Sequence, residues 1–178
     1  MTAAPSPIRR STREAQIVAA ARRIVEEEGG ALTMRRLAAE LGIQAPSLYK
    51  HFRTKHAVVV ALIEQGLLEL GAALHGALSG RGRGGMVPRL LTAYRTAAVG
   101  NPALYRLATS GPFPRAELPP GLEDWAGEPF LLATGDPCRA QALFSLAHGL
   151  VVLEIDDRFP PGSDLRRTWD AGAAAFAS

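Results

Sequence analysis

Residues 32–55 have the sequence LTMRRLAAELGIQAPSLYKHFRTK, and this stretch decides the fold of the N-terminal part of the chain. Apolar residues follow helical spacing up to Leu41, Gly42 interrupts the pattern, and a second short apolar face follows. Pro46 suits the first turn of that second helix, because a missing N–H costs little there. Two short helices joined by a tight glycine turn are typical of a helix-turn-helix motif.

The second helix of such a motif presents its first turn to the major groove of DNA. With Leu48 and Phe52 directed inward as core residues, four side chains remain outward: Ser47, Tyr49, Lys50 and His51. A tyrosine beside a lysine and a histidine is unusual on a surface that meets only water, although a half-buried packing role is the alternative for Tyr49. It is ordinary on a surface that packs against sugar and phosphate.

Helices are predicted on both sides of the motif. The S-x-x-E pattern that begins at Ser11 is a capping box, which starts a helix. Thr33 and Thr54 are placed to cap the helices that follow them, and the helix after Thr54 is expected to be long. Residues 1–10 contain prolines, a serine and two arginines and are expected to form a disordered basic arm.

The composition favours an all-α fold. Of 178 residues, 47% are hydrophobic and only 6% are aromatic, so the core depends on Ala, Leu and Val. The helical patterns predict about nine helices: a three-helix helix-turn-helix domain at residues 11–56, joined by a long fourth helix to a helical domain at residues 57–178. The helix expected over residues 122–134 is predicted to break near Pro129.

Charge and residue usage narrow the function. Residues 1–56 carry a net charge of +5 and residues 57–178 a net charge of −2, so the basic excess lies at the end expected to meet a polyanion. One cysteine, Cys138, excludes an intramolecular disulfide, and neither a signal peptide nor an apolar stretch of membrane length is evident, so we predict a cytoplasmic protein with no membrane partner. No histidines have metal-ligand spacing and no nucleophile lies beside a base, so we expect no metal, no cofactor and no enzyme activity.

Three elements in order, LTMRRLAAELGI, SLYKHF and the lysine three residues later, closely resemble the DNA-binding domain of TetR-family regulators over about residues 11–65. The resemblance implies that Arg35 reaches a base or a phosphate and that the tyrosine, the histidine and the second lysine meet phosphates. Ala45 and Pro46 stand at base-facing positions but cannot make bidentate hydrogen bonds, so base readout would depend on methyl contacts, Arg35 and Lys50. The implied DNA-contacting residues are Thr33, Arg35, Ala45, Pro46, Ser47, Tyr49, Lys50, His51 and Lys55.

The string HGLVVLE at residues 148–154 resembles a signature of the C-terminal half in one TetR subtype. The resemblance implies that the last two helices, expected over residues 137–159 and 163–177, form a four-helix bundle with a second copy of the chain. The first of these helices is apolar nearly all round and therefore needs burial on two sides, although a monomer core helix is the alternative. Its acidic end, from Glu154 to Asp157, is interpreted as solvated. The predicted interface residues are Phe144, Val151, Leu165, Trp169 and Phe176.

Large side chains in the C-terminal half are candidates for an effector pocket, although each is ordinary core in the alternative interpretation. They are Tyr94, Leu104, Tyr105, Phe113, Trp125, Phe130 and His148. The resemblance implies a repressor that binds a palindromic DNA operator as a homodimer and is released by a small apolar or amphipathic ligand. The alternative is an architectural DNA-binding dimer, or an activator, without effector control. A pocket of a few hundred Å³ between the helices expected over residues 88–99 and 137–159 would favour effector control.

Overall fold

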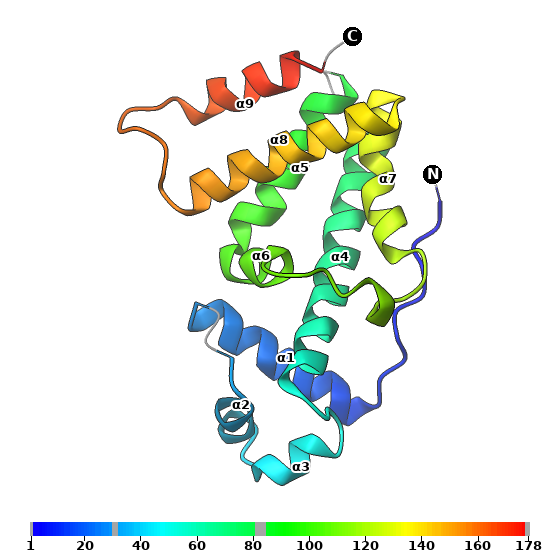
Figure 1. Ribbon diagram of the computed structural model, residues 1–178, viewed down its shortest axis with the longest axis vertical. Coiled ribbons are helices and arrows are strands. Elements are labelled where there is room, and N and C mark those ends of the chain that lie inside the picture. Colours follow the sequence, from blue (N-terminus) through cyan, green and yellow to red (C-terminus); the bar gives the residue numbers. More distant parts are fainter. Residues whose placement is uncertain (1, 30–31, 81–84, 177–178) are drawn as a thin grey trace. The chain divides into compact units, whose positions relative to one another are not determined.

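The computed structural model describes residues 2–29, 32–80 and 85–176, and the regular structure within them is entirely helical (Figure 1). The all-α prediction is confirmed. Residue 177, the expected end of the last helix, lies outside the described residues. The α-helices are α1 Thr12–Glu27, α2 Met34–Glu40, α3 Ala45–Tyr49, α4 Lys55–Ser79, α5 Met86–Gly100, α6 Pro102–Thr109, α7 Leu122–Thr134, α8 Pro137–Ile155 and α9 Leu165–Ala174, and a short 3-10 helix, η1, spans Arg115–Glu117.

The chain divides into two compact units. The N-terminal unit consists of residues 5–67 and 101–122, and the C-terminal unit consists of residues 2–4, 68–100 and 123–176. The predicted boundary after residue 56 differs from this division. The reason is that α6 and the loop after it pack with the N-terminal helices, a long-range contact that leaves no local pattern in the sequence.

Side-chain caps start the helices of the N-terminal unit where the sequence predicts them. The Ser11 hydroxyl accepts a hydrogen bond from the Glu14 N–H (3.2 Å), and the Glu14 carboxylate accepts one from the Ser11 N–H (2.8 Å). Thr33 accepts from the Arg36 N–H (3.0 Å) and Thr54 from the Ala57 N–H (3.1 Å). These contacts satisfy backbone donors that have no partner within the first turn of a helix.

The turn between α2 and α3 depends on Gly42. Its φ of +64° lies in the left-handed region, which glycine adopts without a steric penalty. The Gly42 N–H donates to the Ala39 carbonyl (3.1 Å) and the Ile43 N–H donates to the Ala38 carbonyl (3.0 Å), so α2 ends in a Schellman motif. The chain then turns sharply into α3, where Leu48 is fully buried in the same core.

Helix α6 belongs to the core of the N-terminal unit. Leu104 is 6% exposed and packs among the buried side chains of α1, α2, α3 and α4. Asn101 caps α6 by accepting from the Leu104 N–H (3.1 Å), and its side-chain amide donates to Glu26 of α1 (2.6 Å). A movement of α6 therefore acts directly on α1.

The N-terminal arm is ordered, so the prediction of disorder is wrong for the described residues 2–10. Glu64 of α4 is fully buried, and both of its hydrogen-bond partners come from the arm: the Ile8 N–H (2.6 Å) and the Arg10 guanidinium. Within the C-terminal unit, Thr2 is bound by Glu128, which accepts from its N–H (3.1 Å) and its hydroxyl (2.5 Å). A buried carboxylate is stable only with such partners, and this need orders the arm.

Pro129 does not break α7, contrary to the prediction. Proline lacks the N–H that would bond the carbonyl four residues earlier, which here belongs to Trp125. That carbonyl instead accepts a hydrogen bond from Nε2 of the buried His75 in α4 (2.9 Å). The imidazole also stacks on the Trp125 ring, with 4.9 Å between the ring centroids. His75 thus compensates for the missing backbone bond, and α7 remains continuous.

Among the described residues, two helices are long and apolar enough to cross a membrane by length and composition, so the expectation that no such stretch exists is wrong on that criterion. The most apolar 18-residue window has a mean hydropathy of 1.8 in α4 and of 1.3 in α8. In α4, 44% of that window is buried inside the structure, as in a core helix. In α8 only 17% is buried, so its own chain leaves much of this apolar helix uncovered.

We predict opposite effects for two glycine-to-alanine substitutions in α4. A Cβ at Gly71 would overlap the Trp125 ring, whereas a Cβ at Gly76 meets no atom of the described residues within 4 Å. Gly71→Ala should lower the free energy of unfolding by about 1–3 kcal/mol through overpacking. Gly76→Ala should raise it by about 0.5–1 kcal/mol, because alanine loses less backbone entropy in a helix. Urea denaturation measures both. Equal effects at the two positions would contradict the close approach of Trp125 to α4.

Candidate functional site

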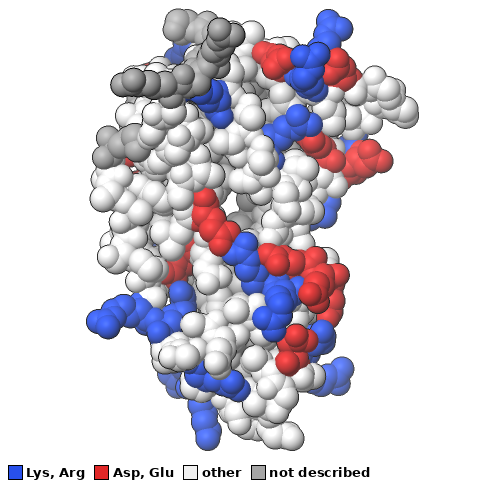
Figure 2. Space-filling model, turned by 180° about the vertical axis from the view of Figure 1, so that it is seen from behind, with Lys and Arg blue, Asp and Glu red and all other residues white. Residues whose placement is uncertain are grey.

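Basic side chains gather at one end of the N-terminal unit. Figure 2 shows blue Lys and Arg side chains around its lower end, where α2 and α3 lie in Figure 1. Along one side of this unit, blue and red side chains are mixed. Some of these cations have acidic partners, among them Arg23 and Arg36.

Arg35 and Arg36 are neighbours in α2 with different surroundings. Arg36 forms ion pairs with Glu40 (2.9 Å) and Glu28 (2.7 Å), and these hydrogen bonds raise the pKa of the Arg36 guanidinium. The same contact to Arg36, supported by Arg23, lowers the pKa of Glu40. Arg35 is exposed and has no ion pair within the described residues. Its full charge is available to an external anion.

Helix α3 turns two residues inward and leaves a polar surface outside, as predicted. Leu48 and Phe52 are buried, while Tyr49 is 47% exposed although it is a large aromatic residue. Among the predicted DNA-contacting residues in and after this helix, Pro46, Lys50 and His51 are also exposed, and Ala45 and Ser47 are half-buried. The first turn thus presents small side chains, with a tyrosine and a lysine directly after them.

The turn from α3 into α4 adds further cations. Lys55 is exposed at the first residue of α4, next to the cap made by Thr54, and Thr33 is exposed at the cap of α2. Sequence reasoning missed Arg53, which is also exposed and has no ion pair within the described part of the chain. Arg53 lies between His51 and Lys55, which were both predicted to contact DNA, and this position could have identified it. Such a surface, with unpaired cations around a helix of small side chains, suits a polyanion with a groove.

The seven predicted effector residues do not meet in one place. In the C-terminal unit, Tyr94 and Phe130 join an aromatic cluster with Phe144 and His148. The Tyr94 and Phe130 rings lie edge to face at 5.7 Å, and the Phe144 and His148 rings stack at 6.1 Å. Trp125 of the same unit stacks on His75 instead. Three of the seven belong to the N-terminal unit: Leu104, Tyr105 and Phe113.

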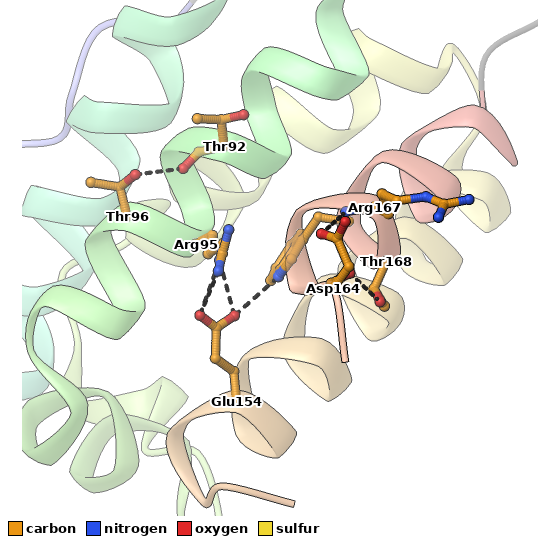
Figure 3. Close-up of polar contacts among 8 residues, drawn as sticks. Thr92, Arg95, Thr96, Glu154, Asp164, Arg167 and Thr168 are labelled. Carbon is orange, nitrogen blue, oxygen red and sulfur yellow. Dashed lines mark hydrogen bonds and ion pairs between the residues drawn. The ribbon is translucent and has the colours of Figure 1, made fainter. Parts of the chain in front are cut away.

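A separate cleft of about 460 Å³ lies in the C-terminal unit, between α5, α8 and α9. Figure 3 shows two of its lining residues, Arg95 of α5 and Glu154 of α8, directed toward each other. The guanidinium donates to both carboxylate oxygens at 2.7–3.1 Å, and the Trp169 indole of α9 donates to Glu154 at 3.1 Å. Burial raises the pKa of Glu154, but the bonds from Arg95 and Trp169 and the charge of Arg95 outweigh burial, so the net shift is downward. Glu154 is therefore a paired, half-buried carboxylate and not part of a solvated helix end.

The predicted dimer residues fall into different environments. Val151 is fully buried and Trp169 is 6% exposed within their own unit, so neither lies on the surface, contrary to the prediction. Leu165 and Phe176 are half-buried, and Phe144 is 46% exposed. Leu153 of α8 is 37% exposed and was not predicted. Helix α8 thus directs one apolar stripe into its own unit and leaves other apolar side chains outside.

The match to a family model covers the helix-turn-helix. Residues 17–62 match the model described as bacterial regulatory proteins, tetR family. Among curated proteins, none matches this chain significantly.

Solved structures extend the similarity to the whole fold. A TetR variant from Acinetobacter baumannii AYE in complex with minocycline is 25% identical, with a TM-score of 0.61 over 91% of this chain and 94% of the other. The multidrug binding protein EbrR complexed with imidazole is 23% identical, with a TM-score of 0.69 over 94% and 97%. A possible TetR family transcriptional regulator from Streptomyces coelicolor A3(2) is 20% identical, with a TM-score of 0.65 over 92% and 96%.

The family model and the fold agree with the geometry of the site. The model covers α2, α3 and the start of α4, which carry the unpaired cations, and the structural matches cover more than nine-tenths of the chain. The family consists of regulators and not of enzymes. Residues 17–62 of the N-terminal unit therefore form a helix-turn-helix that matches the tetR family of bacterial regulatory proteins, and the whole chain has a fold similar to those solved structures.

Proposed function

We propose that the chain is a cytoplasmic, homodimeric repressor that binds a palindromic operator and leaves it when a small apolar or amphipathic ligand binds. The observation that carries this proposal is the distribution of charge on the helix-turn-helix. Arg35, Lys50 and Lys55 are exposed and have no ion pair within the described residues, while Arg36 beside them is neutralised by two glutamates. Cations without internal partners are the ones that gain most from contact with phosphate.

The exposed residues are assigned to DNA as follows. Thr33 and Arg35 contact DNA from the start of α2, with Arg35 reaching a base or a phosphate. The first turn of α3 faces the bases through Ala45, Pro46 and Ser47, and Lys50 adds a cation beside them. Tyr49, His51 and Lys55 meet phosphates. These assignments are supported by the exposure of most of these side chains and by the inward position of Leu48 and Phe52.

Dimerisation is supported by the uncovered surface of α8. Only 17% of its apolar window is buried, and Phe144 and Leu153 remain exposed on it. Exposed apolar surface of this extent marks an interface. We assign it to α8 and α9 of a second copy, because a two-fold dimer explains how two recognition helices read a palindrome.

Effector control is supported by two features of this chain and by two of its structural matches. The cleft of about 460 Å³ between α5, α8 and α9 has the size of a small-molecule site. Helix α6 packs in the DNA-binding unit, where Asn101 is bonded to α1, so a ligand that displaces α6 also displaces α1. The solved structures with minocycline and with imidazole show that similar folds bind small molecules. By linkage, ligand and operator then weaken each other equally.

We predict that two adjacent arginines differ in their importance for DNA binding. Arg35→Ala should weaken binding to a duplex selected from a random library by about tenfold or more, since a base contact contributes about 1–3 kcal/mol. Arg36→Ala should leave affinity nearly unchanged, because its charge is already paired. Fluorescence anisotropy at several NaCl concentrations measures both. If Arg36→Ala were as damaging as Arg35→Ala, the ion pairs of α2 would not decide which cation meets DNA.

We predict a different effect at Lys55, assigned as a phosphate contact. Lys55→Ala should weaken binding to selected and unrelated duplexes alike and reduce the slope of log affinity against log salt by about one unit. The same titrations measure it, with Arg36→Ala as the control. An unchanged slope would remove Lys55 from the phosphate contacts. Failure of the library to yield a palindrome would count against a sequence-specific dimer.

We predict that Leu153→Asp yields a folded monomer. The side chain is already 37% exposed, so the charge should not unfold the unit, but it would be buried without a partner in a dimer. Val151→Asp is unsuitable, because Val151 is core and its substitution would unfold the chain. Light scattering at micromolar concentration should show a dimer for the wild type and for the control Ala19→Asp, at an exposed alanine of α1. If the Leu153→Asp variant were still dimeric, the dimer interface would have to lie elsewhere on the chain.

A further inference from the structure

We propose that the cleft between α5, α8 and α9 binds an amphipathic monoanion, a molecule with an apolar body and one carboxylate or comparable oxyanion. The inference rests on the proposed effector control, for which it names the site and the ligand class. The sequence predicted seven other residues for the effector pocket, and the structure places none of those seven in the lining of this cleft.

The cleft follows one face of α5 for most of its length. Its α5 wall consists of residues at helical spacing from Pro88 to Gly100, and the opposite wall is the face of α9 that bears Arg166, Trp169 and Ala173. The thirteen helical residues from Pro88 to Gly100 span about 18 Å, so the cleft is elongated. An extended molecule with an apolar chain matches this shape better than a compact one.

The floor of the cleft offers hydrogen-bond donors but no free carboxylate. Both oxygens of Glu154 accept two hydrogen bonds each, from Arg95 and, for one oxygen, from Trp169, which fills the acceptor sites of a carboxylate. Arg95 uses Nε and one terminal nitrogen in these bonds, which are its hydrogen bonds within the described residues. An incoming cation would find no acceptor at Glu154, whereas an anion would find N–H groups of Arg95.

The walls add apolar surface and a second cation. Leu91, Val99 and Ala173 and the Trp169 ring provide the apolar lining. Arg166 lines the cleft and makes no ion pair or hydrogen bond through its side chain within the described residues. Asp170 lies on the same wall and opposes it in charge, while Arg95 of α5 and Arg166 of α9 line the cleft from two different helices. In the proposed complex the anionic group contacts these two arginines and the apolar body lies along α5.

The position of the cleft also gives a route to the DNA-binding unit. The α5 wall ends at Gly100, and the next residue, Asn101, caps α6 and donates to Glu26 of α1. A ligand that shifts the end of α5 therefore pulls on the residue that holds α6 to α1. This continuity of the backbone connects the proposed site to the proposed response.

The test is calorimetric titration of the full-length protein with decanoate, and with decanol and decyltrimethylammonium as probes of equal chain length. Decanoate should bind saturably and the other two should bind more weakly. Arg166→Gln should weaken decanoate by about tenfold, the effect of losing one charge-assisted hydrogen bond, and leave decanol unchanged. Arg167→Gln is the matched control, because Arg167 is adjacent in α9 but does not line the cleft.

A second variant fills the cleft without touching its ion pair. Thr96 lines the cleft, and its hydroxyl donates only to the carbonyl of Thr92 in its own helix (2.8 Å), so Thr96→Phe should abolish decanoate binding and keep the melting temperature near that of the wild type. Decanoate binding that survives in both Thr96→Phe and Arg166→Gln, or no binding by the wild type, would overturn the inference. Effector control is tested separately, by measuring the affinity for the selected DNA duplex with and without decanoate. If decanoate binds in the cleft but leaves this affinity unchanged, the site is supported and effector control through it is contradicted.

Discussion

Helix α4 supplies buried residues to both compact units, so a single stretch of 25 residues has to satisfy two different cores. In the N-terminal unit it contributes Leu62 and the fully buried Glu64, and in the C-terminal unit it contributes Gly71 and His75. Two of these are unfavourable in a buried helix taken alone, because one is charged and one is glycine. Each is tolerated because a distant segment supplies what it needs. The N-terminal arm pairs with the carboxylate, and the Trp125 ring fills the space beside the glycine.

The proposed DNA-binding surface follows from which charges the protein neutralises internally. Glu28 and Glu40 hold Arg36 and Arg23 along α1 and α2, and this stabilises the packing of the two helices. Arg35 is left without such a partner at the start of α2. In the C-terminal unit the cation itself is paired, because Arg95 binds Glu154 in the cleft. All acceptor sites of the Glu154 carboxylate are filled by hydrogen bonds, but Arg95 keeps N–H groups that are not used in them. In both places, the charge that the fold leaves unsatisfied is the one available to a partner.

The sequence predicted the features that depend on near neighbours. The caps at Ser11, Thr33 and Thr54 and the glycine at position 42 each act within a few residues, and all four are where the pattern placed them. The inward and outward sides of α3 were predictable for the same reason. Most of the errors involve contacts far apart in the sequence: the ordered arm, the continuity of α7 at Pro129, the place of Leu104 in the N-terminal core, and the cleft. Arg95 and Glu154 form an ion pair although they are 59 residues apart, and no helical periodicity in the sequence could predict that contact.

The long reach of the N-terminal arm has a consequence for synthesis on the ribosome. Ile8 is bound by a residue 56 positions later, and Thr2 by one 126 positions later. At translation rates of about 5–20 residues per second, Thr2 waits roughly 6–25 s for Glu128 to be made. The helix-turn-helix is complete in the nascent chain long before that. The arm thus leaves the ribosome early but forms its hydrogen bonds late. During this interval it is accessible to proteases and chaperones, although the helices of the helix-turn-helix have already emerged.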